Sequence, residues 1–83
     1  MKSKMILEIV LPASNMQIEV KIPRQLKIGQ VKNMLVDFLK KQGGEYIPTQ
    51  ESMLCDMESG TALDVNLFIE NVGLHNGSRL MLI

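Results

Sequence analysis

Apolar and polar residues alternate along the first quarter of the chain, which is the pattern of β-strands. Over residues 5–11 one face is wholly apolar, and it consists of Met5, Leu7, Ile9 and Leu11. The other face of this run holds Ile6, Glu8 and Val10. Over residues 16–22 the even-numbered positions are apolar and the odd-numbered positions are polar. Residues 12–15 are typical of a turn, so the two runs predict a β-hairpin.

After Pro23 the spacing of apolar residues changes to that of an α-helix. From residue 28 they recur every three or four positions, as Ile28, Val31, Leu35, Phe38 and Leu39. Gly43-Gly44 is expected to end this helix. Lys27 is a poor cap, and Gly29 lowers the helix propensity of the first turn. The sequence therefore predicts one amphipathic helix with a weak start.

The second half of the chain predicts short elements separated by turns. Residues 45–51 read as a polar connection, and residues 52–56 as a short strand with Met53 and Cys55 inward and Leu54 outward. Residues 58–60 predict a turn, residues 61–63 a very short fourth strand, and residues 67–74 a loop or one helical turn. Asn76-Gly77 turns into the last strand, residues 79–83. Leu80 and Leu82 are expected to face inward, with Met81 and Ile83 outward.

This order of elements predicts an α+β fold in a single domain over residues 1–83. The helix has to cover one face of a mixed sheet of four to five strands. The last strand is almost wholly apolar, which favours a place in the middle of the sheet beside the first strand. Both expectations describe a β-grasp arrangement.

The chain resembles ubiquitin-like proteins, and most closely the bacterial YukD-like family. The matching features are the hairpin at 5–22, the helix opening Ile28-x-x-Val31-Lys32, the strand Met53-Leu54-Cys55, the turn Ile69-x-x-x-Gly73-Leu74 and the closing Asn76-Gly77-x-x-Leu80-x-Leu82. The resemblance implies a cytoplasmic, non-enzymatic accessory of a type VII secretion system. No functional residue of the family is carried over to this sequence.

In ubiquitin and the sulfur carriers of the same fold, a tail ending in Gly-Gly follows the last strand. The present sequence ends in that strand, at Ile83. The resemblance therefore implies protein binding rather than covalent transfer. A sulfur or conjugation carrier, and a homodimeric regulator, remain as alternatives.

Composition narrows the choice of partner. Nine basic and nine acidic residues balance, and the chain has only three aromatic residues, so neither nucleic acid nor a membrane is an expected partner. Residues 1–41 hold eight Lys and Arg and three acids, whereas residues 42–83 hold one base and six acids. This division either steers a partner or is averaged out by the fold. No run is long enough to cross a bilayer, and the lone Cys55 is compatible with a reducing cytoplasm.

No group of residues predicts a catalytic, cofactor or metal site. His75 has no convergent partners and is expected to be a solvated turn residue, and Cys55 to be an inert thiol. The spacing of Asp56, Glu58 and Asp64 is not that of a calcium loop. Tyr46, Phe38 and Phe68 are expected in the core or as anchors.

The outward faces of three predicted strands suggest a binding surface. If the last strand lies between the first and third strands, five apolar side chains form one contiguous patch on the face away from the helix. They are Ile6, Val10, Leu54, Met81 and Ile83. A contiguous exposed apolar patch usually marks a protein-binding site. The expected partner is a protein, either a component of a secretion system or a second copy of the chain.

Overall fold

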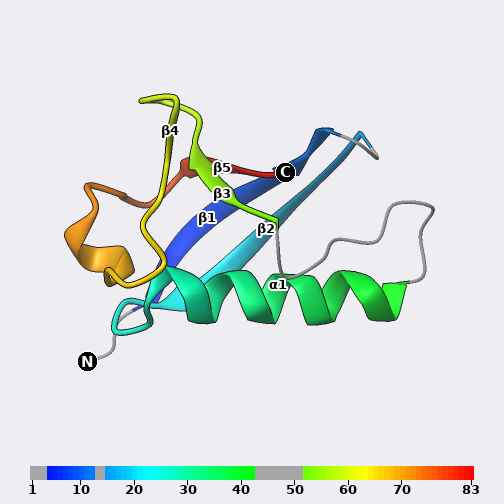
Figure 1. The fold of residues 1–83 in the computed structure, drawn as a ribbon, viewed down its shortest axis with the longest axis horizontal. Coiled ribbons are helices and arrows are strands. Elements are labelled where there is room, and N and C mark those ends of the chain that lie inside the picture. Colours follow the sequence, from blue (N-terminus) through cyan, green and yellow to red (C-terminus); the bar gives the residue numbers. More distant parts are fainter. Residues whose placement is uncertain (1–3, 13–14, 43–51) are drawn as a thin grey trace.

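The computed structural model of the protein describes residues 4–12, 15–42 and 52–83. One helix lies across one face of a five-stranded mixed sheet (Figure 1). The elements follow the chain as β1 (Lys4–Leu11), β2 (Met16–Pro23), α1 (Ile28–Gln42), β3 (Leu54–Asp56), β4 (Thr61–Ala62), the 3₁₀-helix η2 (Ile69–Asn71) and β5 (Ser78–Leu82). This is the α+β, β-grasp architecture that the sequence predicts. Gly43-Gly44, Tyr46 and the predicted connection 45–51 lie outside the described residues.

The strands are ordered β2-β1-β5-β3-β4. β1 and β2 form an antiparallel hairpin with Met5 opposite Ile22 and Leu11 opposite Met16. β5 runs parallel to β1 and antiparallel to β3, so the last strand occupies the middle of the sheet as predicted. Its central place explains its composition, because Ser78, Leu80 and Leu82 are buried on the face toward the helix.

The core lies between the sheet and α1. The inward side chains of β1 are buried, as the alternation predicts, and so are Ile28, Val31, Leu35 and Leu39 of the helix. Phe38 was expected on this buried side of the helix, but 48% of its surface is exposed. Val36 is buried instead. Phe68 is also exposed, with the Lys27 ammonium 5.6 Å from its ring centroid, so neither phenylalanine belongs to the core.

The weak start of α1 is compensated by contacts from a distant loop. The backbone N–H groups of Ile28 and Gly29 donate to the carbonyl oxygens of Leu67 and Val65, at 2.8 and 3.0 Å. The side chain of Gln30 accepts from the N–H of Lys27 at 2.9 Å, which is one half of a capping box. A Cβ at Gly29 would lie 3.2 Å from the Val65 carbonyl oxygen, so glycine allows this loop to approach closely.

The predicted orientation of the third strand is wrong. Leu54 lies opposite Leu82 in the β3–β5 ladder, and residues directly opposite one another point to the same face. Leu54 is therefore a core residue, 2% exposed, while Met53 is 50% exposed. Cys55 lies opposite Met81 and shares its face, away from the helix.

The remaining short elements match the sequence expectations closely. β4 is a two-residue strand, and within 67–74, where a loop or one helical turn is predicted, the structure has the helical turn η2. Gly73 and Gly77 have φ values of 81° and 91°, which the turns around η2 and before β5 require. Within the described residues, no helix is both long and apolar enough to cross a membrane.

Candidate protein-binding face

The face of the sheet that is turned away from α1 presents side chains from β1, β5 and β3. Their positions follow from the register. Val10 on β1 is the partner of Met81 on β5, and Met81 is the partner of Cys55 on β3. Three apolar side chains thus occupy neighbouring positions across three strands.

A second pair extends this row beyond the end of the ladder. Met53 and Ile83 exchange backbone hydrogen bonds of 2.6 and 2.9 Å, so they lie opposite each other. Met53 is 50% exposed and Ile83 is 46% exposed. We call Val10, Met53, Cys55, Met81 and Ile83 the apolar patch.

A row of polar side chains crosses the same face beside the apolar patch. Arg79 Nε donates to Glu8 Oε1 at 2.7 Å, and the Gln17 amide donates to the other oxygen of Glu8. The Arg79 guanidinium, followed by the Gln17 amide, lowers the pKa of Glu8 below its usual 4.5. This polar row, formed by Gln17, Glu8 and Arg79, borders the apolar patch on one side, and its three side chains are held by their mutual hydrogen bonds.

The polar row divides the surface that the sequence predicted as one patch. Ile6 lies on the far side of Glu8 from Val10, next to Gly77 in a shallow depression of about 550 Å³. Ile6 is next to the backbone of the Asn76–Gly77 turn. The N–H of Gly77 donates to the Ile6 carbonyl oxygen at 2.8 Å. Of the five predicted residues, Val10, Met81 and Ile83 belong to one patch, Ile6 is separate, and Leu54 is in the core.

Met53 and Cys55 are the patch residues that the sequence analysis missed. Met53-Leu54-Cys55 is an apolar run without a polar residue that marks its solvent side. The one polar neighbour, Asp56, shares the face of Leu54 by strand alternation, so it favours the wrong orientation of the strand. The pairing with β5 decides the orientation.

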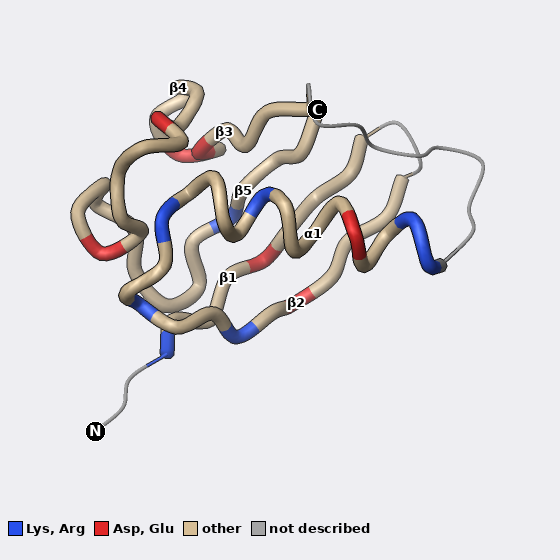
Figure 2. Tube along the Cα trace, turned by 60° about the horizontal axis from the view of Figure 1, so that its bottom comes forward, with Lys and Arg blue, Asp and Glu red and all other residues tan. Residues whose placement is uncertain are grey.

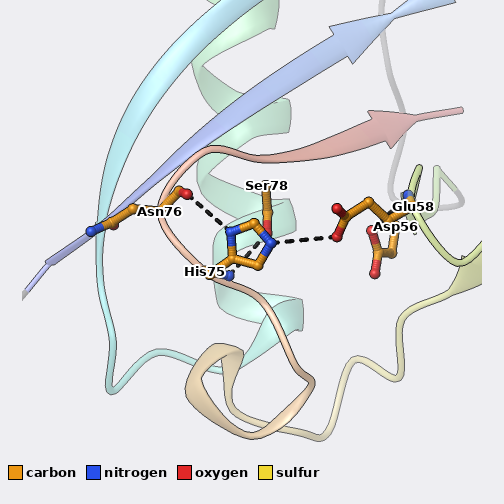
Figure 3. A network of polar contacts seen from close by, with 5 residues as sticks. All are labelled: Asp56, Glu58, His75, Asn76 and Ser78. Atoms are coloured by element: carbon orange, nitrogen blue, oxygen red, sulfur yellow. Dashed lines mark hydrogen bonds and ion pairs between the residues drawn. The ribbon is translucent and has the colours of Figure 1, made fainter.

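The only histidine of the chain connects the turn before β5 with the turn after β3 (Figure 3). His75 Nε2 lies 3.4 Å from Glu58 Oε1, and Nδ1 lies 3.0 Å from the Asn76 carbonyl oxygen. The Asn76 carbonyl, and then the Glu58 carboxylate, raise the pKa of His75 above its usual 6.5. His75 is exposed, as expected, but it forms an ion pair when protonated.

The acidic residues near Gly60 accept hydrogen bonds from their own turns. Asp56 Oδ1 accepts from the Glu58 N–H at 3.0 Å, and Asp64 Oδ1 accepts from the Asn66 N–H at 2.8 Å. Among the described residues no group of three or more His, Cys, Asp or Glu side chains is arranged to hold a metal ion. Their structural role is therefore to close turns.

The division of charge along the sequence persists in part in the fold. Asp56, Glu58, Asp64 and Glu70 lie at the end of the molecule formed by β3, β4 and η2 (Figure 2). Basic residues lie on β2, in the connection between β2 and α1, and along the helix. Glu8, Glu19 and Asp37 lie among the basic residues, on β1, β2 and α1, so the asymmetry persists only in part.

Solved structures with a similar fold include ubiquitin-like domains. Ubiquitin of Caldiarchaeum subterraneum matches with a TM-score of 0.79 and 19% identity, over 98% of this chain and 92% of that one. A structure described as molecular mimicry of SUMO that promotes DNA repair matches with a TM-score of 0.77 and 14% identity, over 96% and 90% of the two chains. The protein therefore has the ubiquitin-like β-grasp fold.

A chain of the ESX-5 inner membrane complex also contains a similar unit. The TM-score is 0.71 at 14% identity, and the match covers 96% of this chain but 20% of that chain. No protein-family model and no curated protein sequence matches.

Proposed function

We propose that this protein is a non-enzymatic, ubiquitin-like adaptor that binds a partner protein through the apolar patch. The observation on which this rests is the exposure of Met53 and Ile83 beside Val10 and Met81, on a face that the helix does not cover. An apolar centre bordered by charged side chains is the usual composition of a protein interface. The two methionines add adaptability, because an unbranched thioether repacks against differently shaped surfaces.

The partner that we propose is a cytoplasmic or membrane-anchored component of a bacterial type VII secretion system. The resemblance to YukD-like proteins suggests this setting. The match to part of a chain of the ESX-5 inner membrane complex supports it, since it places the same fold within an inner-membrane assembly. The location of the adaptor would then be the cytoplasm.

The experiment combines a secretion assay with a matched pair of variants. Met53→Asp places a charge in the apolar patch, and Leu67→Asp places one on an equally exposed apolar side chain in the loop before η2. Both variants should fold, because each side chain is already about half exposed. Loss of type VII secretion with Met53→Asp alone supports the proposal, and normal secretion with Met53→Asp contradicts it.

A homodimeric regulator that uses the apolar patch is the second candidate. It predicts that Met53→Asp abolishes self-association, which sedimentation measurements at several protein concentrations detect. A carrier of the same fold predicts a different result, the formation of an adenylate or thioester with ATP and a cognate activating enzyme.

A further inference from the structure

A second apolar surface lies on the other side of the sheet, between β2 and α1. Met34 and Phe38 project from the helix and are 49% and 48% exposed. Together with Ile18, Val20 and Ile22 they line a groove of about 570 Å³. A contiguous exposed apolar surface usually marks a binding site, and this one lies on the helix side of the sheet, whereas the apolar patch lies on the opposite face.

The groove runs along an outer strand of the sheet. β2 stands first in the strand order and pairs with β1 on one side. The backbone groups on its other side are those that an added strand would bind. Over residues 16–22 this edge is regular and carries only three polar side chains on the face away from the helix, namely Gln17, Glu19 and Lys21.

The charges on β2 are complementary to themselves in one antiparallel register. If two copies pair about Val20, Glu19 of each copy lies opposite Lys21 of the other, and Ile18 lies opposite Ile22. A register centred on Glu19 places two carboxylates opposite each other, and one centred on Lys21 places two ammonium groups opposite each other. Opposite charges across a strand pair are stabilising and like charges are destabilising, so the charges select the register about Val20.

We propose that the β2 edge and the adjoining groove bind a second copy of this chain, with the two β2 strands antiparallel about Val20. The pairing is isologous, since the same surface serves both copies. Its two-fold axis stands perpendicular to the sheet, and therefore both helices lie on one face of a continuous sheet. Met34 and Phe38 of each copy then face the junction, which removes the exposed apolar surface of the groove from water.

This dimer is independent of the proposed adaptor function, but it affects how an adaptor works. The apolar patch lies on the face opposite the helices, so the dimer presents two patches in the same direction. Two linked patches bind a partner with repeated sites more tightly than one patch does.

The test is a charge exchange measured by sedimentation equilibrium of the whole chain. Glu19→Lys alone, or Lys21→Glu alone, places like charges opposite each other twice, and we expect the dimer dissociation constant to rise about tenfold or more. The double variant Glu19→Lys/Lys21→Glu restores opposite charges and should restore the dimer. Glu70→Lys makes the same change of net charge as Glu19→Lys but lies in η2, outside β2 and the groove, so it is the control and should have no effect.

Two further measurements test the dimer independently, in case a charge variant folds poorly. Phe38→Lys changes an exposed side chain at the groove and should also weaken the dimer, while circular dichroism remains that of the wild type. Amide hydrogen exchange in β2 should slow as protein concentration rises. A wild-type chain that stays monomeric, or a double variant as weak as the single ones, overturns the proposal. So does an extended foreign peptide that binds this edge while the chain remains a monomer.

Discussion

The guanidinium of Arg79 binds the carboxylate of Glu8 across the parallel pair β1–β5, with 2.7 Å between Nε and Oε1. The two residues are 71 positions apart in the sequence, and the fold makes them direct neighbours. Gln17 completes the row from β2. This row separates the apolar patch from Ile6 and so determines the extent of the proposed binding surface.

The contact between Glu8 and Arg79 makes the free energy of unfolding depend on pH in the acid range. Because the folded pKa of Glu8 lies below its usual 4.5, the ionised form is favoured in the folded state. The stability that the ionised Glu8 carboxylate contributes is fully present above pH 4.5, and it is lost as the pH falls through the lowered pKa. In urea unfolding at a series of pH values, Glu8→Gln should reduce this acid-dependent loss of stability. A variant whose pH profile matches that of the wild type would show that the ionisation of Glu8 does not contribute to the loss of stability in acid.

Leu54 distinguishes the observed orientation of β3 from the predicted one. Because the side chain is buried against Leu82, Leu54→Ala should lower the free energy of unfolding by about 2–5 kcal/mol. Met53→Ala should change it by less than about 0.5 kcal/mol, since Met53 is half exposed. Chemical denaturation measures both. The reverse order of effects would mean that β3 faces the other way.

His75 gives the opposite dependence on pH. Both ring nitrogens face acceptor oxygens, and only the protonated imidazole donates to both. The raised pKa means that the stabilisation is complete below pH 6.5 and is lost as the pH rises through the folded pKa. An NMR titration should find the His75 pKa above 6.5, and Glu58→Gln should lower it. A pKa that does not change in Glu58→Gln would remove Glu58 from this account.

Gly77 is required by the turn that aligns β5 with β1. Its φ of 91° is unfavourable for residues with a Cβ, and its N–H donates to the Ile6 carbonyl at 2.8 Å. Gly77→Ala should therefore cost about 1–2 kcal/mol of stability. No atom outside the turn would touch the added Cβ, so a loss of that size reflects backbone conformation alone. Unchanged thermal stability would show that the turn accommodates alanine.

The sequence predicts the long elements well because their patterns repeat. The hairpin shows several cycles of alternation, and α1 shows apolar spacing over about three turns, from Ile28 to Leu39, so single exceptions do not change the result. β3 has three residues, and its one polar residue, Asp56, shares the face of the buried Leu54, so alternation alone favours the wrong orientation. Its orientation comes from pairing with β5, which local pattern does not contain.

Side chains at the margin of the core were harder to predict for a related reason. Phe38 has the spacing of a core residue, but it lines the groove between α1 and β2, the outer strand of the sheet, where part of its side chain is exposed. The contact between Glu8 and Arg79 depends on strand order and register together. No spacing within one segment indicates either feature.

The most direct test of the proposed function is the affinity of the protein for a purified type VII secretion component, measured by calorimetric titration. We expect the double variant Met53→Asp/Ile83→Asp to bind at least about tenfold more weakly than the wild type, because both residues would be buried at the interface. Leu67→Asp should bind as the wild type does. Equal affinity of the double variant and the wild type would contradict the assignment of the apolar patch as the binding site.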